Sequence, residues 1–422
     1  MPTFLHLSDI HFSMFGGAPE HDLEAKVRAR MLDDIRAMNE KLGPMDAVMV
    51  VGDIAGHGQS EEFALASEFL DEVCGIVHCP VERVVCVPGN HDINRESQDS
   101  LHDAARFFLR HTQPQELSDQ THRLLTEQRG ADLLFSTLEN YNEFAIQYGC
   151  SIGPSQITWT PKSFSLGDRE ILIYGITTCW VSDNSDSDVN DESRLVVGEF
   201  QCGQIGDDPK QFSLAMMHHP HGWLRDASII EPWLNRAHVV LTGHEHASGI
   251  EPDAAGRRVT IASGAVNPNR EESGWIPAYN VIEMSLAGEE SKTLRLAVHV
   301  RSWQANHGPT TVAQFGPDSR FDDPYVVDIH LESMGDEESE ASPPPVLNAP
   351  VPAPTPEPID SDLRRIVLRI MRASPDDRRR AARSLGILSP TETGGLAVDK
   401  MILNRALERD LLTELERLIR NG

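Results

Sequence analysis

Five short apolar runs recur along the chain, and each of them stops at a cluster of polar residues. The runs read FLHL, AVMVV, VVCV, LAMM and VVL, and they begin at residues 4, 47, 84, 214 and 239. Unbroken apolar runs of this length are typical of strands buried on both faces of a sheet. Stretches of helical composition, such as 23–42 and 60–73, lie between the early runs. This alternation predicts an α/β fold.

The polar clusters that follow the runs are rich in histidine, aspartate and asparagine. Ligands of α/β sheets collect beyond the carboxyl ends of the strands, and all five clusters fall at such ends. We therefore expect the clusters to meet in one site. They are Ser8-Asp9-Ile10-His11, Gly52-Asp53, Gly89-Asn90-His91-Asp92, His218-His219-Pro220 and Gly243-His244-Glu245-His246.

Carboxylates and imidazoles together suit divalent ions of Mn, Fe or Zn, and the lack of cysteine in the clusters excludes a thiolate-type structural zinc site. Two ions about 3.5–4 Å apart, sharing a carboxylate, would leave positions for water and a phosphoryl oxygen. Glycines before three of the clusters' residues would let the backbone approach the ions closely. Seven candidate ligands are too many for one ion: Asp9, His11, Asp53, Asn90, His218, His244 and His246.

In this order, the clusters resemble the pattern D-x-H, GD, GNH(D/E), H and GHxH of the calcineurin-like metallophosphoesterase superfamily, over roughly residues 3–300. The resemblance implies a four-layer α/β fold in which two packed mixed β-sheets are flanked by helices. It also implies a metal-dependent phosphoric ester hydrolase with two divalent ions. By the resemblance, one ion is held by Asp9, His11, Asp53 and His246. The second ion is held by the bridging Asp53 and by Asn90, His218 and His244.

The resemblance also implies roles for the remaining polar residues. His91 would be the catalytic histidine, protonating the leaving oxygen or stabilising charge, and Asp92 would orient it. The family's ligand is usually the histidine two places before proline, hence His218. Strand alternation predicts that only one histidine of the pair faces the ions, so His219 would line the substrate pocket. His57 is a second pocket candidate.

The motif GDIAGHG lacks the aspartate and arginine of the GDxxDRG motif of protein Ser/Thr phosphatases. Together with LSDIHF and GNHD, it is more similar to the cyclic-nucleotide and small-phosphodiester branch. We therefore expect attack of a metal-bound hydroxide on a phosphodiester, or else a phosphomonoester, of a small molecule or nucleotide. A metal-dependent nuclease is the alternative enzyme. A non-catalytic interaction protein on the same scaffold is the alternative of another class, and the presence of all seven ligands disfavours it.

The chain carries a formal net charge of −28. Residues 361–422 are net basic, with 13 Lys and Arg against 9 Asp and Glu, so the acidic excess lies in the first 360 residues. Such a field repels polyanions and disfavours extended nucleic-acid binding. The N-terminal residues resemble no signal peptide, and no run approaches eighteen apolar residues, so we expect a cytoplasmic protein without a membrane span.

Composition changes sharply at residues 332–358, which are acidic and then proline-rich and read as a linker. We expect a phosphoesterase domain over 1–331, with a helical cap insertion at about 97–150, and a small all-helical domain over 359–422. The latter faintly resembles the effector-associated adaptor domains of bacterial conflict systems, which implies recruitment of a protein partner. A stabilising or dimerising appendage and, less so, a helix-turn-helix DNA binder remain open.

Overall fold

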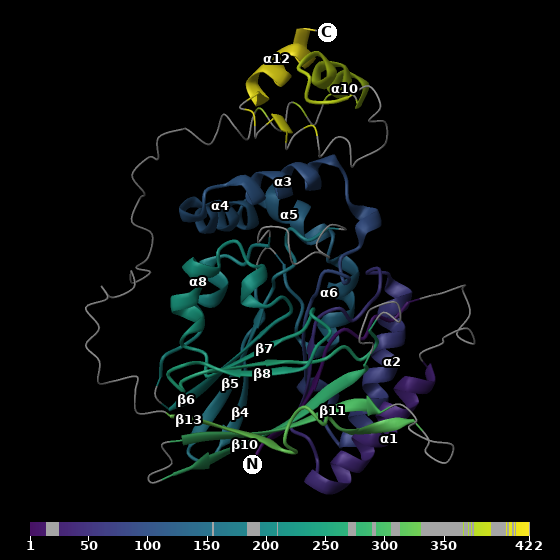
Figure 1. Ribbon diagram of the computed structural model, residues 1–422, viewed down its shortest axis with the longest axis vertical. Helices are drawn as coiled ribbons and strands as arrows, with labels where there is room; N and C mark the ends of the chain where they lie inside the picture. Colours follow the sequence, from purple (N-terminus) through teal and green to yellow (C-terminus); the bar gives the residue numbers. More distant parts are fainter. Residues whose placement is uncertain are drawn as a thin grey trace. The chain divides into compact units, whose positions relative to one another are not determined.

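The computed structural model (Figure 1) consists of two compact units. The first comprises Met1–Ser97 and Thr112–Glu337, and the second comprises Gln98–His111 and Glu338–Gly422. The structure describes residues 1–13, 25–153, 156–183, 195–208, 210–268, 276–288, 293–304, 313–330, 366, 370, 373, 375–389, 402, 405–406, 409 and 411–421. The predicted linker at 332–358 lies outside the described residues.

One sheet of the first unit has the strand order β12-β11-β10-β1-β2-β3, and β13 also pairs with β11. Strands β1, β2 and β3 are parallel, whereas β10 runs antiparallel to β1. The sheet is therefore mixed. Its strands are β1 (Thr3–Leu7), β2 (Ala47–Val51), β3 (Val84–Val87), β10 (Ala278–Ala287), β11 (Thr293–Gln304), β12 (Gln314–Pro317) and β13 (Tyr325–His330).

The other sheet has the order β4-β5-β6-β7-β9-β8. Strands β5, β6, β7 and β9 are parallel, and β4 and β8 are antiparallel to their neighbours. The sheets pack together, as the rings of Phe4 and Phe164 show with centroids 5.4 Å apart. The strands of this second sheet are β4 (Lys162–Leu166), β5 (Arg169–Ile176), β6 (Gln211–Met217), β7 (Val239–Thr242), β8 (Gly249–Pro252) and β9 (Val259–Ala262).

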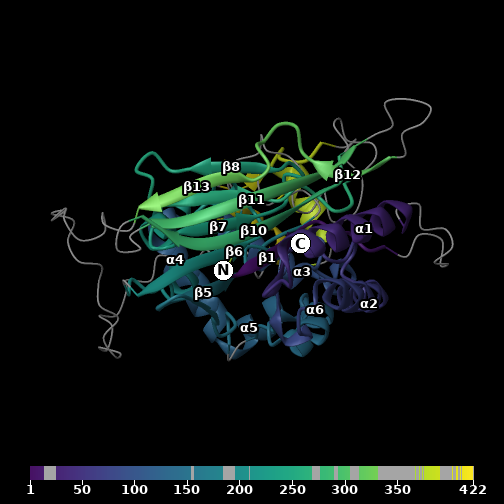
Figure 2. The same cartoon turned by 90° about the horizontal axis from the view of Figure 1, so that it is seen from below.

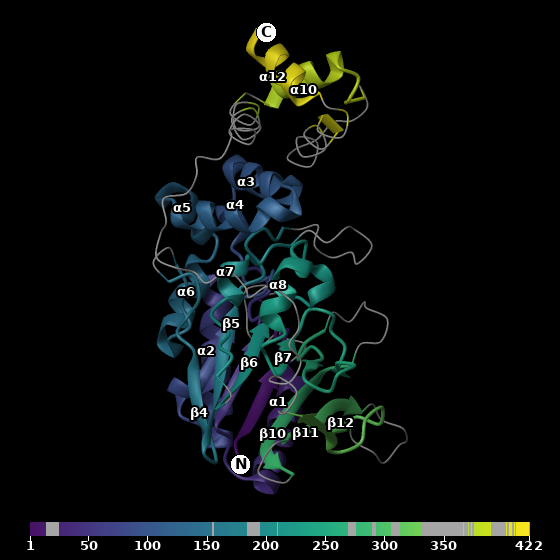
Figure 3. The same cartoon turned by 90° about the vertical axis from the view of Figure 1, so that its left-hand side faces the viewer.

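Helices flank the two sheets. Figure 2 shows the strands of both sheets gathered together, with α1, α2, α5 and α6 outside them. Figure 3 shows α4 and α5 beyond the same end of the strands as α7 and α8, and α4 contacts α7. The helices of this unit are α1 (Ala25–Leu42), α2 (Ser60–Val77), α4 (Pro114–Thr126), α5 (Gln128–Ser136), α6 (Glu139–Ala145), α7 (Glu199–Cys202) and α8 (Ala227–Leu234).

The predicted fold of two packed mixed sheets with flanking helices is confirmed. The five apolar runs form β1, β2, β3, β6 and β7, and every residue of β1, β2, β3 and β7 is buried. Burial of both faces explains why these strands show no alternation of apolar and polar residues. Helix α1 instead buries one stripe at helical spacing, formed by Val27, Met31, Leu32, Ile35, Met38 and Asn39.

The second unit joins a helix of the predicted cap insertion to the C-terminal segment. Ala104 and Phe107 lie in one buried apolar core with residues such as Ile387 and Leu415. The insertion at 97–150 is thus shared between the two units, because α4, α5 and α6 belong to the first. The described helices of the second unit are α3 (Ser100–His111), α10 (Pro375–Ser384) and α12 (Leu412–Asn421).

None of the helices among the described residues combines the length and the apolar character that a bilayer crossing requires. All six cysteines are among the described residues, and all of them are buried.

Phe107→Ala should weaken the second unit, because it removes a ring that is only 7% exposed in its core. Loss of a buried phenylalanine ring costs about 3–5 kcal/mol. We expect faster amide hydrogen exchange in α10 and α12 of the full chain, measured by mass spectrometry. The matched control is Phe135→Ala in the first unit, where the ring is 6% exposed, and it should leave that exchange unchanged. Wild-type exchange in Phe107→Ala would contradict a core shared with α3.

Candidate metal centre

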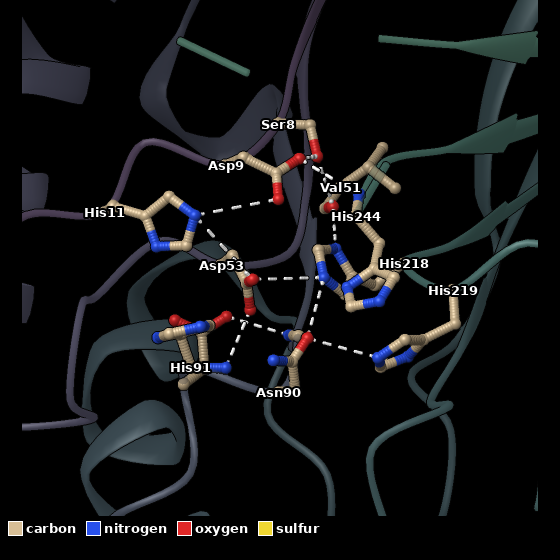
Figure 4. A network of polar contacts seen from close by, with 12 residues as sticks. Ser8, Asp9, His11, Val51, Asp53, Asn90, His91, His218, His219 and His244 are labelled. Carbon is tan, nitrogen blue, oxygen red and sulfur yellow. Dashed lines mark hydrogen bonds and ion pairs between the residues drawn. The ribbon is translucent and has the colours of Figure 1, made fainter. Parts of the chain in front are cut away.

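Residues that follow strands of both sheets come together at one point (Figure 4). Asp9, Asp53 and Asn90 follow β1, β2 and β3 of the first sheet, whereas His218 and His244 follow β6 and β7 of the second. Because the strands within each set are parallel, their carboxyl ends meet at one edge of each sheet. The five clusters therefore meet in a single site, as the sequence predicts.

Asp9 is a fully buried carboxylate in this site. Its Oδ2 accepts hydrogen bonds from the hydroxyl of Ser8 at 2.5 Å and from the backbone N–H of His244 at 3.1 Å. Its Oδ1 is buried without a hydrogen-bond partner and lies 3.3 Å from Nε2 of His246. Burial favours the neutral acid, but contact with His246 and the charges of His246 and His218 hold the pKa of Asp9 below its usual value.

Asp53 is the second buried carboxylate and lies between histidines of both sheets. Its Oδ2 is 3.2 Å from Nε2 of His218 and 3.8 Å from Nε2 of His11. Its Oδ1 accepts the backbone N–H of His91 at 2.7 Å. Burial opposes ionisation, yet nearby His218 holds the pKa of Asp53 well below its usual value. Asp53 in turn outweighs the effect of burial on His218 and raises the pKa of that imidazole to about 9.

Three further histidines, His11, His244 and His246, have rings that could bind a cation. The Nε2 atoms of His11 and His246 face each other at 3.4 Å, on the side of the site where Asp9 lies. Burial lowers the pKa of His11 to about 4 and that of His244 to about 3. The rings of His11 and His244 are therefore neutral at pH 7, which is the form that coordinates metal.

Both histidines of the His218-His219 pair face the site. Their Nε2 atoms lie 3.2 Å and 3.1 Å from Oδ1 of Asn90. Strand β6 ends at Met217, so strand alternation does not continue through the pair. The assignment of His218 as the metal ligand and of His219 as a pocket residue stays a prediction. Nδ1 of His219 lies 2.6 Å from the hydroxyl of Thr178, which fixes the second ring. Sequence reasoning missed Thr178, because no motif surrounds it.

His91 is held by backbone groups. Its Nδ1 lies 2.8 Å from the carbonyl oxygen of Gly56, so Nδ1 carries the proton and donates it to that carbonyl. The carboxylate of Asp92 accepts backbone N–H groups of Ile54, Ala55 and Gly89 at 2.8–2.9 Å. Burial and the Asp53 charge raise the pKa of Asp92 to about 8, although the bonds from Gly89 and Ala55 oppose the rise. Through these hydrogen bonds Asp92 connects the loop after β2 to the loop after β3. Its role in orienting His91 stays a prediction.

Two residues lie at the margin of the site. His57 has a side chain that is 63% exposed, and its Nδ1 pairs with Glu62 at 3.1 Å. Its predicted contact with substrate stays a prediction. The ring of Trp223 lies 4.3 Å from that of His244, centroid to centroid, and its Nε1–H donates to Glu245 at 3.2 Å. Sequence reasoning missed Trp223, although it stands only four residues after the His218-His219 pair.

The backbone at the site is strained. Among L-amino acids, a positive φ costs about 1–2 kcal/mol per residue, because Cβ approaches the carbonyl oxygen. Such strain is typical of functional sites. Five of the seven candidate ligands have φ between 50° and 68°: Asp9, His11, Asp53, His244 and His246.

The glycines that precede ligand residues leave room for other ligands. A Cβ at Gly52, where φ is 78°, would lie 2.5 Å from Nδ1 of His218. A Cβ at Gly89 would lie 2.8 Å from Cδ2 of the same ring, and one at Gly243 would lie 2.9 Å from Oδ2 of Asp9. The predicted close approach of backbone at these glycines is therefore present.

The residues fit divalent metal ions. The unpartnered Oδ1 of Asp9 and the facing nitrogens of His11 and His246 are groups that a cation would satisfy. The donors are imidazole nitrogens and carboxylate oxygens, as Mn, Fe or Zn prefer. Within the part of the chain that the structure describes, four groups of three have ligand atoms within 4.8 Å of one another: Asp9, His11 and His246; Asp9, Asp53 and His218; His11, Asp53 and His91; and His218, His219 and His244.

Gly243→Ala should reduce metal content, because the added methyl group would overlap the hydroxyl of Ser8 and press on Asp9. Overpacking of this kind also costs about 1–3 kcal/mol of stability. Elemental analysis after reconstitution with Mn²⁺ and thermal denaturation measure the two effects. Gly222→Ala is the control in the loop after β6, since its methyl group would meet no atom within 4 Å. Equal metal content in both variants would contradict the packing described here.

Comparison with known proteins gives a match to one family. The profile of the calcineurin-like phosphoesterases matches residues 2–248, which is more than half of the chain. No curated protein matches the sequence.

Similar solved structures include a putative 5'-nucleotidase from Staphylococcus aureus, which is 14% identical with a TM-score of 0.37, over 76% of this chain and 55% of that one. A purple acid phosphatase from yellow lupin (Lupinus luteus) is 11% identical with a TM-score of 0.36, over 76% and 54%. Vps29 of Entamoeba histolytica, complexed with zinc, is 11% identical with a TM-score of 0.31, over 78% and 99%.

This chain spans about half the length of the nucleotidase and of the lupin phosphatase. At these TM-scores, none of the three similarities bears on activity. The family match rests on the sequence of residues 2–248, which contains all seven candidate metal ligands. The chain belongs to the calcineurin-like phosphoesterase family.

Proposed function

We propose that this protein is a two-metal phosphodiesterase that hydrolyses small phosphodiesters. Membership of the calcineurin-like phosphoesterase family supports metal-dependent phosphoester hydrolysis as the general reaction. To this general reaction the proposal adds a preference for phosphodiesters, the number of metal ions and a role for each residue.

The position of Asp53 is the observation that carries the proposal. Its Oδ2 lies 3.2 Å from His218, which groups with His219 and His244, and 3.8 Å from His11, which groups with Asp9 and His246. A carboxylate between two such groups is the arrangement that bridges a pair of ions. His11 and His246, with Asp9, would hold one ion, and His218, His244 and Asn90 the other.

Two divalent ions, when bound, would supply Lewis-acid stabilisation of the phosphoryl oxygens and lower the pKa of a water molecule. The protein's part is to hold its ligands rigidly. Ser8 and the N–H of His244 fix Asp9, the carbonyl of Val51 fixes the ring of His218 at 2.8 Å, and the N–H of His91 fixes Asp53. Preorganised ligands of this kind spare the reorganisation that water would require.

His91 is the proposed acid. Because Nδ1 donates to the carbonyl of Gly56, Nε2 is the ring atom left to face a substrate. The ring also packs edge-on against that of His11, with centroids 4.7 Å apart, so it lies beside a proposed ligand of the first ion. Protonated at Nε2, His91 would donate to the leaving oxygen or to a charged phosphoryl oxygen.

Charge supports a small diester over the other phosphoesters. A diester carries one negative charge, whereas a monoester carries up to two and a nucleic acid carries many. With −28 in total and the acidic excess in the first 360 residues, the chain repels the more highly charged substrates more strongly. A metal-dependent nuclease is the second enzyme to test.

The C-terminal segment is proposed to recruit a protein partner within a bacterial conflict system. The basis is its faint resemblance to effector-associated adaptor domains. A cytoplasmic location is proposed on the sequence alone. The domain boundaries at 331 and 359 likewise stay proposals.

Reconstituted wild-type protein should hold close to two divalent ions per chain, as expected of a two-metal hydrolase. Asp53→Asn should lose at least one of them, because the bridging charge is removed. Elemental analysis after loading with Mn²⁺, Fe²⁺ or Zn²⁺ gives the stoichiometry. Asp33→Asn, on the exposed surface of α1, is the control and should retain both ions. A wild-type value at or below one ion per chain would rule out the dinuclear site.

His91→Ala should retain both metal ions but lose about 10²–10⁴-fold in turnover, the range expected for an acid or a charge-stabilising group. Turnover of bis(4-nitrophenyl) phosphate, cyclic nucleotides and single-stranded oligonucleotides is measured in parallel, which also separates a diesterase from a nuclease. His122→Ala, an exposed histidine of α4, is the control. Turnover of His91→Ala equal to that of the control would remove this role from His91.

A further inference from the structure

An aromatic side chain stands at the rim of the metal centre. Trp223 is only half-buried, whereas His218 and His219 beside it are fully buried. The indole ring lies 4.3 Å from the ring of His244 at 90°, and 6.3 Å from that of His219 at 45°. Trp223 is therefore next to the proposed ligands of the second ion and is also accessible from outside.

The indole is held in one orientation. Its Nε1–H donates to Oε1 of Glu245 at 3.2 Å, and Glu245 stands between His244 and His246 in the chain. The backbone of Trp223 is fixed as well, since its N–H donates to the carbonyl of Pro220 at 3.0 Å. Leu195 donates its N–H to the carbonyl of Trp223 at 3.3 Å. Because hydrogen bonds hold both its side chain and its backbone, Trp223 presents its ring in a fixed position.

The hydrogen bond to Glu245 uses the only donor that the indole has. What the side chain can still offer a ligand is its flat aromatic face. Such a face favours another flat aromatic group and gains little from a flexible aliphatic chain. The chemistry of the rim thus selects for an aromatic substituent on the phosphoester.

Glu245 further restricts which aromatic substituents of a phosphoester fit beside Trp223. It is exposed, and with Oε1 taken by the indole its Oε2 can accept a hydrogen bond from an amino group. The same carboxylate repels a second phosphate beside the indole. A nucleobase with an amino group meets both conditions, whereas a nucleoside diphosphate or triphosphate extending along this rim does not.

We propose that Trp223 is the specificity-determining residue of this enzyme and that it stacks on the base of a nucleoside phosphodiester, with Glu245 reading the amino group of the base. The proposal rests on the proposed function, since it places the phosphate of the same substrate at the metal centre. The other role that the contacts allow is purely structural, with the indole only supporting the ring of His244.

The test compares full-length, metal-loaded variants on one aromatic and one aliphatic diester. Cyclic AMP is the aromatic probe, and glycerophosphoethanolamine is the aliphatic one. Trp223→Leu keeps apolar bulk against His244 but removes the aromatic face, whereas Trp223→Phe keeps an aromatic face. Trp303→Leu replaces another half-buried tryptophan, on β11, and is the matched control.

Trp223→Leu should reduce the preference in kcat/KM for cyclic AMP over glycerophosphoethanolamine by about 5- to 150-fold, the size of one lost base–aromatic stack. The loss should appear mainly in KM. Trp223→Phe should recover most of the preference, and Trp303→Leu should keep it. An equal loss on both diesters would show that Trp223 only supports His244, and an unchanged preference would show that it contacts no base. Either result would overturn the proposal.

Binding separates this proposal from the proposed function. Calorimetric titration of the metal-loaded protein with AMP and with inorganic phosphate needs no turnover. We expect Trp223→Leu to weaken AMP binding about 5- to 150-fold relative to phosphate binding. If wild type hydrolyses neither diester but shows this binding difference, the stacking site stands and the proposed reaction fails. If wild type hydrolyses diesters but AMP binds no more tightly than phosphate, the reaction stands and the stacking proposal fails.

Discussion

The hydrogen bond between the ring of His218 and the carbonyl of Val51, 2.8 Å long, joins the two sheets where the ligands meet. It fixes a histidine of the second sheet onto the backbone of the first. The bond from the N–H of His244 to Asp9 makes the same crossing. The site can exist only while the two sheets keep their register across this contact. The buried strands behind it therefore act as a frame that holds the seven proposed ligands, which come from distant parts of the sequence.

This frame also carries conformational strain. Asp9, His11 and Asp53 are held at positive φ by hydrogen bonds between neighbouring loops, including Asp9 N–H to Gly52 and His11 N–H to Asp53, at 3.1 Å and 3.0 Å. At about 1–2 kcal/mol for each residue, the strain is comparable to the net stability of a typical domain if all five ligands are counted. Strands buried on both faces, such as β1 and β2, offset it through their large apolar contacts. The strained turns and the rigid sheets thus require each other.

Sequence reasoning located the strands and the site because both depend on local signals. Runs such as AVMVV mark buried strands, and motifs such as GNHD place ligands directly after them. It could not show that the rings of both His218 and His219 approach Asn90, because the end of β6 cannot be fixed to one residue from composition. It did not anticipate that Phe107 of the insertion shares a core with Leu415, since a contact over three hundred residues leaves no local pattern. Trp223 was missed because its meaning depends on His244, which is adjacent in space but not in sequence.

The division of the proposed ligands between two sheets affects how stable the folded protein is in a cell. Ions bound by the proposed ligands of both sheets would act as cross-links that exist only in the folded chain, and they would add to its stability by mass action. The gain is about 2.7 kcal/mol when the free metal is at one hundred times its dissociation constant. Under metal starvation this contribution would disappear, whereas the strain of the turns around Asp9 and His246 would remain. Proteases would then meet the unfolded chain more often, and the amount of enzyme would follow the supply of its metal.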